Sequence, residues 1–444
     1  KQEETEIILM IRDNELILYR NFDDSIFKEM AHAANTCGRA DINEEKTVET
    51  VYTCIHEMVS IAQSHGFEGN LWHGYLTWLL ITNENAFSTA CEKQGDVGGS
   101  LSRLARHDLE IFMEAYHADW HMVEEKFNIR FLDMMSSYDG GRFKGVVYSH
   151  GLRDRIEQLS ELLAHAGNVE AMYEALTEFY KDYGVGKFGL HRAFKIKENS
   201  AETVIVPITR TEKVVLSDLV GYEIQKQKLI ANTEAFVKGK KANNVLLYGD
   251  SGTGKSTSIK AILNEYYKDG LRMIEVYKHQ FKDISNIIAQ IKNRNYKFII
   301  YMDDLSFEEF EIEYKYLKAV IEGGLETKPD NVLIYATSNR RHLIRETWGD
   351  RKQSADDVHG RDSMQEKLSL ATRFGESIYY GAPDQKEYID IAKTLAKRSG
   401  IAMDEKEIET QAVRWEMMHG GLSGRTAKQF IHHLLGTLPD GNDM

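Results

Sequence analysis

Proline is scarce in this chain of 444 residues: there are only four, and none precedes Pro207. Because proline breaks helix interiors, its absence from the first 206 residues favours long helices there. Cysteine is scarcer still. Cys37, Cys54 and Cys91 are odd in number and lack metal-ligand spacing. They predict reduced thiols in a cytoplasmic protein.

Long apolar runs are also lacking. The longest in the N-terminal half, Leu71–Ile81, is interrupted by polar residues and is too short to span a bilayer. No secretory signal pattern opens the chain, so we expect no membrane partner. Within the run, Trp72, Tyr75, Trp78 and Leu79 recur at helical spacing, which is typical of core packing or of a partner contact.

The charge is unevenly distributed. The chain has 55 Lys and Arg against 69 Asp and Glu, a formal net charge of −14. Residues 1–200 hold 20 basic and 33 acidic residues, a net of −13, and residues 201–444 hold 35 and 36, a net of −1. An acidic first half argues against a general nucleic-acid clamp. It suits a basic protein partner or a solvated surface.

The periodicity of apolar residues changes along the chain. Up to residue 183 it is mostly helical, which predicts an N-terminal helical domain over 1–183. The glycines and β-branched residues of 184–218 indicate a linker. Short apolar runs then alternate with helical pattern, which predicts a parallel sheet covered by helices. The expected strands are Val245–Tyr248, Met273–Tyr277, Phe298–Met302 and Val332–Ala336, and the tail from about 385 is helical.

A phosphate-binding loop follows the first of these strands. Eight residues match G-x-x-x-x-G-K-[ST], and a helix beginning at Thr257 follows them. Glycines let backbone N–H groups surround phosphate oxygens, and the helix N-terminus adds partial positive charge. We expect Lys255 to reach the β- and γ-phosphates and the hydroxyl of Ser256 to coordinate Mg²⁺. The residues expected to bind the nucleotide here are Gly249, Asp250, Ser251, Gly252, Thr253, Gly254, Lys255 and Ser256 of the loop and Thr257 directly after it.

Two further strands end in polar side chains. Asp303 and Asp304 follow Phe298–Met302, where Asp303 is expected near Mg²⁺ and Asp304 orients or deprotonates a water. Asn339 closes the next strand, where its amide can hold that water against the γ-phosphate. The alternatives are an ordinary acidic strand end and an ordinary turn, since asparagine favours turns.

In this order, the motifs resemble the Walker A, Walker B and Asn-bearing third strand of an AAA+ ATPase module. The resemblance implies that Val220, Gly221 and Tyr222 pack on adenine, that Arg373 is an arginine finger acting on a neighbouring subunit, and that Arg425 senses the γ-phosphate from a lid. It also implies a P-loop NTPase fold, with a five-stranded αβα core over 219–384 and a helical lid over 385–444. ATP and Mg²⁺ are then sandwiched between subunits of a homo-oligomer.

The chain resembles one bacterial family more narrowly, catalogued as domain of unknown function 815. The similar segments are 303–308, 317–326 and 329–343, and the resemblance covers about 185–444. It implies an ATPase that hydrolyses ATP to ADP and phosphate to drive conformational change in an oligomer or a partner. The N-terminal half carries no motif; its expected role is to move or select a protein partner.

Two departures favour an alternative, an ATP-dependent switch or loader with slow hydrolysis. Many AAA+ proteins carry Asp-Glu where this chain has Asp303-Asp304, so either the site shifts, Glu308 assists, or hydrolysis is slow. The segment Tyr277–Ile284 lacks the aromatic–hydrophobic–Gly loop of ring unfoldases. Its lysines and aromatics could touch a nucleic-acid backbone, or the segment is a helix start whose apolar residues pack inward.

A final helical pattern leaves a metal site open. Glu110, Glu114, His117 and His121 are spaced by four, three and four residues, which places them on one face of a continuous helix. Glu-x-x-His is the spacing of carboxylate metal sites in helical bundles, but no second copy is present. The alternative is a solvated polar face.

Overall fold

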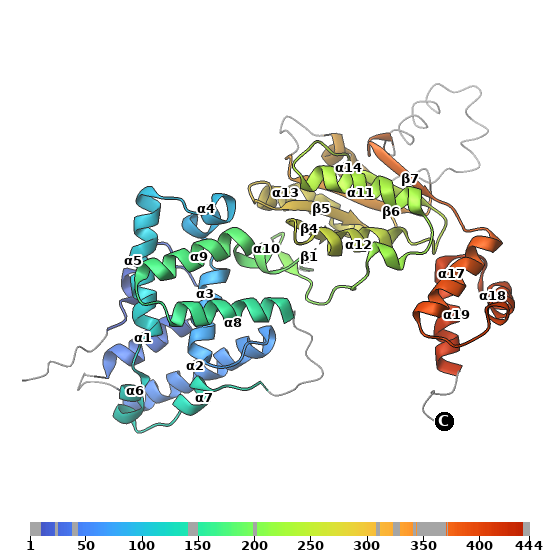
Figure 1. Ribbon diagram of the computed structural model, residues 1–444. Helices are drawn as coiled ribbons and strands as arrows, with labels where there is room; N and C mark the ends of the chain where they lie inside the picture. Colours follow the sequence, from blue (N-terminus) through green and yellow to red (C-terminus); the bar gives the residue numbers. More distant parts are fainter. Residues whose placement is uncertain are drawn as a thin grey trace, which may run out of the picture. The chain divides into compact units, whose positions relative to one another are not determined.

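The computed structural model describes residues 10–22, 25–37, 43–140, 150–198, 202–307, 311–322, 329–340, 343, 370 and 372–437. The chain divides into two compact units, 1–191 and 192–444 (Figure 1). Among the described residues, we find no helix with the length and apolar character that a bilayer crossing requires.

The first unit is helical. Asparagine side chains begin several helices: Asn43, Asn70 and Asn168 each accept a backbone N–H from the first turn of α2, α3 and α9. The elements are η1 (Asp13–Glu15), α1 (Ile26–Thr36), α2 (Glu44–His65), α3 (Leu71–Thr82), α4 (Ala86–Gln94), α5 (Gly99–Tyr116), α6 (Trp120–Phe127), α7 (Leu132–Ser136), α8 (His150–Ala164), α9 (Val169–Tyr183) and α10 (Gly186–Leu190).

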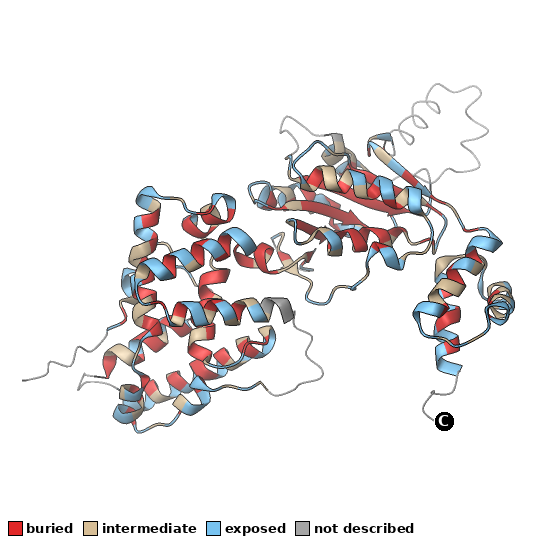
Figure 2. Ribbon diagram, in the orientation of Figure 1, coloured by how far each residue is buried: buried red, intermediate tan, exposed pale blue. Residues whose placement is uncertain are grey.

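Helix α3 is the centre of this unit and is buried over most of its length (Figure 2). Trp72 and Tyr75 are fully buried, and the Trp72 indole N–H donates to the carbonyl of Ala115 at 2.7 Å. The Trp72 ring also stacks on Phe27. The aromatic residues at helical spacing in α3 therefore pack in the core. A helix that is apolar on all sides is expected to be buried.

The polar residues considered for a metal site do not share one helix face. Helix α5 ends at Tyr116, and Asp119 caps a new helix, α6, by accepting the N–H of His121. Glu114 instead pairs with Arg12 at 2.6 Å, which fastens the N-terminal segment to α5. The described residues contain no group of three or more His, Cys, Asp or Glu placed to hold a metal ion. The spacing argument fails because the helix is interrupted.

The second unit holds a seven-stranded sheet in the order β2-β1-β4-β5-β6-β3-β7, parallel except for β2. This confirms the expected α/β class. Every residue of β6 is buried, as expected for a strand covered on both faces. The strands are β1 (Ala193–Ile196), β2 (Ile205–Pro207), β3 (Val245–Gly249), β4 (Leu271–Glu275), β5 (Lys297–Met302), β6 (Val332–Ser338) and β7 (Glu376–Tyr380).

The sheet is wider than the five strands expected. Residues 184–218, expected as a linker, form α10, β1, β2 and η2 (Leu216–Asp218). Strand β1 pairs parallel with β4 and antiparallel with β2. Two added strands therefore cover the edge of β4, whose backbone groups would otherwise lack partners.

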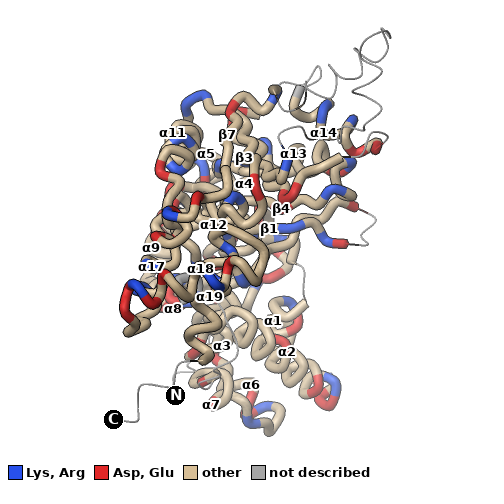
Figure 3. The backbone as a smooth tube through the Cα atoms, turned by 90° about the vertical axis from the view of Figure 1, so that its right-hand side faces the viewer, with Lys and Arg blue, Asp and Glu red and all other residues tan. Residues whose placement is uncertain are grey.

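Helices flank the sheet and form the lid. The flanking helices are α11 (Glu223–Val237), α12 (Lys255–Tyr266), η3 (Lys278–Asp283), α13 (Ile284–Ile291) and α14 (Glu313–Glu322). The lid helices are α17 (Gln385–Arg398), α18 (Glu405–His419) and α19 (Gly424–Thr437), which share an apolar core that Val220 joins. Along the described chain, acidic and basic residues are interspersed (Figure 3).

Candidate functional site

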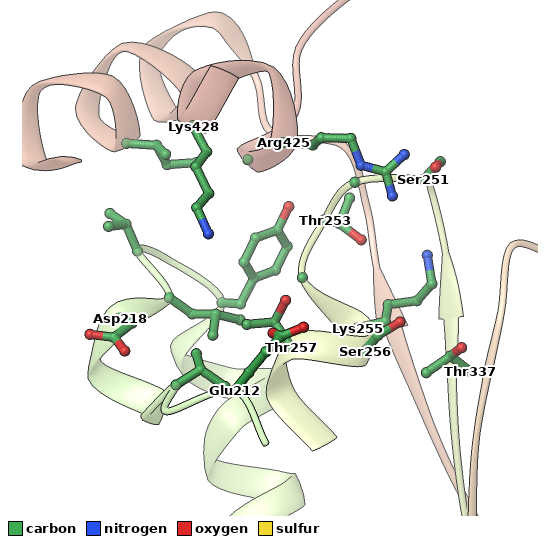
Figure 4. A pocket seen from close by; sticks show the side chains of 18 of the residues that line it. Glu212, Asp218, Ser251, Thr253, Lys255, Ser256, Thr257, Thr337, Arg425 and Lys428 are labelled. Atoms are coloured by element: carbon green, nitrogen blue, oxygen red, sulfur yellow. The ribbon is translucent and has the colours of Figure 1, made fainter. Parts of the chain in front are cut away.

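A cavity of about 1020 Å³ lies at the carboxyl ends of β3, β5 and β6, beneath the lid (Figure 4). The carboxyl ends of parallel strands meet at one edge, so polar residues after different strands converge there. The predicted residues that line it are Val220, Tyr222, Ser251, Gly252, Thr253, Gly254, Lys255, Ser256, Thr257, Asp303, Asp304, Asn339 and Arg425.

The loop between β3 and α12 depends on glycine at two positions. Gly249 has φ +133°, and a Cβ there would collide with the carbonyl of Tyr380. Gly254 has φ +93°, and a Cβ there would lie 2.8 Å from the Leu219 side chain. The chain can therefore turn tightly from strand to helix only without side chains at these points.

Lys255 is 6 % exposed, and all three of its ammonium protons have acceptors. Its Nζ donates to the carbonyls of Gly249 (3.0 Å) and Asp250 (2.6 Å) and to Oδ1 of Asn339 (3.0 Å). Burial lowers the pKa of the Lys255 ammonium, while nearby carboxylates, Asp250 first, act against the shift. The cation is thus held among oxygens at the mouth of the loop.

One carboxylate oxygen of Asp303 accepts hydrogen bonds from two hydroxyl groups. Ser256 and Thr337 both donate to its Oδ1 at 2.6 Å. Although burial alone would raise it, these hydrogen bonds hold the pKa of the Asp303 carboxyl below its ordinary value. The group is therefore an anion faced by two oxygen donors.

Asp304 has a left-handed backbone, with φ +48°, which is uncommon for a non-glycine residue. Its N–H donates to the hydroxyl of Thr337 at 2.9 Å, and its Oδ1 accepts from Nδ2 of Asn339 at 2.7 Å. Thr337 thus binds both aspartates, and Asn339 joins Asp304 to Lys255. Such strain is found at functional sites when surrounding contacts hold it.

The first turn of α12 offers an anion-binding end. Gly254 is its N-cap and contributes no side-chain cap, and the first turn holds no acidic residue. The N–H groups of a helix's first turn lack acceptors within the helix and carry partial positive charge. Together with Lys255, this end suits a phosphate. The oxygen donors Ser256 and Asp303 suit a hard cation such as Mg²⁺.

The residues expected to pack on adenine lie at the other end of the cavity. Val220 and Tyr222 line it, but Gly221 does not. The hydroxyl of Tyr222 donates to the carbonyl of Gly381 at 2.9 Å, and its ring stacks on Tyr380. Burial raises the pKa of Tyr222 to about 12, so the hydroxyl stays protonated.

Arg425 reaches the site from α19. Its backbone N–H donates to the carbonyl of Gly252 at 3.2 Å, so the lid contacts the phosphate loop directly. Other residues that line the cavity, chiefly Thr337 and Lys428, were not among the predicted site residues. Each could have been identified from the sequence. Thr337 places a hydroxyl group at the end of an apolar strand, and Lys428 follows Arg425 by three residues on one helix.

The remaining predicted residues lie outside the cavity lining. Gly249 and Asp250 act through their carbonyls on Lys255, and the Asp250 carboxylate accepts the N–H of Ala382 at 2.8 Å. Arg373 precedes β7, at the amino ends of the parallel strands, where Gly375 lies beside Asn243. Glu308 lies outside the described residues.

The basic and aromatic residues of Tyr277–Ile284 do not form a single exposed surface. Phe281 is buried and packs edge-on against Phe307. Lys278 pairs with Glu311. The inward-packing alternative therefore describes much of the segment, although Tyr277 stays 44 % exposed.

Comparison with known proteins gives a family, a local likeness and a fold likeness. A protein family described as Protein of unknown function (DUF815) matches residues 189–438. Replication factor C large subunit of Methanococcus vannielii is 34% identical over 74 residues, which are 17% of this chain and 15% of that protein.

Solved structures of RuvB, the Holliday junction branch migration motor of Thermotoga maritima, are also similar. One has 17% identity and a TM-score of 0.36, covering 50% of this chain and 65% of its own. A mutant form has 16% identity and a TM-score of 0.35 over the same shares. The chain thus spans less than two thirds of each of these relatives.

Proposed function

We propose that this chain, which belongs to the family described as Protein of unknown function (DUF815), binds ATP with Mg²⁺ in the cavity beneath the lid and hydrolyses it to ADP and phosphate. The observation that carries the proposal is one continuous hydrogen-bonded chain across three strand ends. It joins Lys255, Asn339, Asp304, Thr337, Asp303 and Ser256.

The phosphates lie against the loop and the start of α12 in this proposal. Lys255 exchanges the two loop carbonyls for phosphate oxygens, which satisfy the same two protons, while its third proton stays with Asn339. Ser256 and Asp303 hold Mg²⁺, whose chemistry is to neutralise charge on the phosphate oxygens. Val220 and Tyr222 form part of the wall on the adenine side.

Asp304 and Asn339 position and activate the attacking water. The Asp304 carboxylate accepts a proton of the water, and the amide of Asn339 fixes the carboxylate through the 2.7 Å hydrogen bond. Thr337 holds the backbone of Asp304 in its left-handed conformation. Positioning of this kind is the main contribution that a protein makes to phosphoryl transfer.

A homo-oligomer completes the site. Arg373 lies near the amino ends of the parallel strands, whereas the cavity of its own subunit lies at their carboxyl ends. The five residues of β7 span about 16 Å between these two ends. Arg373 therefore acts on a neighbouring subunit, where a cation stabilises the transition-state charge.

Arg425 transmits the state of the phosphates to the lid, since it is joined to the loop at Gly252. The helical first unit then moves or selects a protein partner in the cytoplasm; three buried cysteines that form no disulfide with one another support that location.

The alternative is an ATP-dependent switch or loader with slow hydrolysis that binds a protein or nucleic-acid partner. The observation that favours it is Asp304, whose side chain is one methylene shorter than glutamate and is already held by Asn339. A protein with this shorter carboxylate, already hydrogen-bonded to Asn339, would bind ATP equally well. It would polarise the attacking water less effectively and so hydrolyse ATP slowly.

Phosphate release from ATP by the wild type tests the proposal. We expect specific activity per subunit to rise with protein concentration and to stop when EDTA removes Mg²⁺. ATP binding without phosphate release at every concentration would favour the switch. Absence of both binding and release would refute the site.

Thr337→Val removes a hydroxyl but keeps the shape of the side chain. Because it deprives Asp303 of a donor and Asp304 of an acceptor, we expect turnover to fall about tenfold and half-maximal activity to need more Mg²⁺. A Mg²⁺ titration of the rate checks this. Thr233→Val is the matched control: it also loses a buried hydroxyl bonded to β6, but far from Asp303. An unchanged Mg²⁺ requirement in Thr337→Val would contradict the proposed role.

A further inference from the structure

A second lid cation shares the cavity with Arg425. Lys428 lies three residues further along α19, about 4.5 Å along the helix axis, so both side chains leave the same face. Both line the cavity. Figure 4 shows the guanidinium of Arg425 on the side of Ser251 and Thr253, and the ammonium of Lys428 extending into the cavity on the side of Asp218.

Within the part of the chain that the structure describes, neither cation is neutralised by an ion pair. Among the described residues, no carboxylate lies within 4.0 Å of the charged groups of Arg425 or Lys428. Among the other cavity charges, Glu212 pairs with Lys260 at 2.8 Å and Arg398 donates to the carbonyl of Asp218 at 3.1 Å, while Lys213 is also without an ion pair in the described chain. Two unneutralised cations facing one cavity, with Lys255 below them, suit a ligand with several negative charges.

The cavity has a polar end and an apolar end, and Lys428 lies between them. The polar end is the phosphate loop with Asp303, Asp304 and Asn339. The more apolar end is lined by Val214, Leu219, Val220, Ile391 and Leu395, and the charged residues Lys213, Asp218 and Arg398, close to them in sequence, also line the cavity. Arg425 is fixed to the polar end because its N–H is bonded to Gly252. Lys428, one turn away, is closer to the apolar end.

We infer that Lys428 is a further nucleotide-binding residue, which contacts the α-phosphate at the junction of base and phosphates. This inference rests on the proposed function and adds a division of work within the lid. Lys428 contacts a group that ATP and ADP share, whereas Arg425 faces the phosphates that distinguish them. Lys428 therefore closes the lid on either nucleotide, and Arg425 makes closure depend on which one is bound.

Equilibrium binding of a non-hydrolysable ATP analogue, ADP and adenosine tests the inference. For Lys428→Ala we expect the Kd of the ATP analogue and of ADP to rise by the same factor, about tenfold, and the Kd of adenosine to stay unchanged. Lys428→Arg should restore both affinities, because it returns the cation. For Arg425→Ala we expect a larger loss for the ATP analogue than for ADP.

Controls separate the possible failures. Lys406→Ala removes a lid cation outside the cavity lining and should leave all three affinities unchanged. If the wild type binds neither the ATP analogue nor ADP, the proposed function fails and this inference with it. If the wild type binds both and Lys428→Ala does so equally well, only the inference fails. A loss confined to the ATP analogue would also overturn it, since Lys428 would then contact the terminal phosphate.

Discussion

We expect Lys255→Ala to lower ATP turnover by about 10²–10³-fold or more, as removal of one preorganised charge-stabilising donor does in other enzymes. The Lys255 ammonium is the cation at the mouth of the loop, and it also holds Asn339 at 3.0 Å. The substitution therefore removes charge from the phosphates and loosens the amide that positions Asp304. ATP affinity should fall as well, because the contact exists before the transition state.

Phosphate release and nucleotide binding, measured on the same preparation, check this result. Lys260→Ala is a matched control, since it removes a lysine from the same helix whose partner is Glu212 rather than the loop. Thermal unfolding belongs beside both variants, because Lys255 also bonds the carbonyls of Gly249 and Asp250. Wild-type turnover in a folded Lys255→Ala protein would refute the assignment of the site.

Arg373→Ala should bind ATP normally and yet lose turnover by about 10³–10⁵-fold, the range of arginine fingers. The reason is its position. Arg373 precedes β7 at the amino ends of the strands, while the cavity of its own subunit lies at the carboxyl ends. Binding within one subunit is therefore independent of Arg373, and only a neighbour's hydrolysis depends on it.

A mixing experiment makes this prediction specific. Lys255→Ala subunits cannot bind phosphate productively but keep the finger, and Arg373→Ala subunits have the opposite defect. Mixed together, two inactive proteins should recover part of the wild-type activity. Arg414→Ala, which removes an exposed lid arginine, should remain active alone. Failure of the mixture under conditions where the two variants demonstrably co-assemble would contradict action in trans.

The buried strands were predictable, whereas the half-buried ones were not. Strands β3, β5 and β6 are largely apolar runs, because helices cover both their faces, whereas β4 begins two residues earlier than expected and contains Arg272 and Glu275. Strand β7 alternates, with Ser377 and Tyr379 exposed, as an edge strand does. Strand β1 has only four residues and one exposed lysine. Such strands are specified by their neighbours more than by their own sequence.

The residues of the candidate site also differ in how far the sequence alone predicts them. The phosphate loop is local in sequence, so its spacing alone predicts Lys255 and Ser256. The role of Thr337 is not local: its hydroxyl meets Asp303 and Asp304 only because β6 lies beside β5. The helical spacing of Glu110 to His121 misled for a related reason. Asp119 begins a new helix there, and an N-cap residue was the available signal.

The added pair of strands at the sheet edge determines where a fragment that contains the second unit alone should begin. A fragment starting at residue 219 matches the core that motif spacing delimits, but it discards β1 and β2. It would present β4 with a row of unsatisfied N–H and C=O groups, a template for aggregation through strand pairing between molecules. A fragment starting at 192 keeps that row internally satisfied, so the boundary for recombinant expression lies 27 residues upstream of the boundary that catalysis alone suggests.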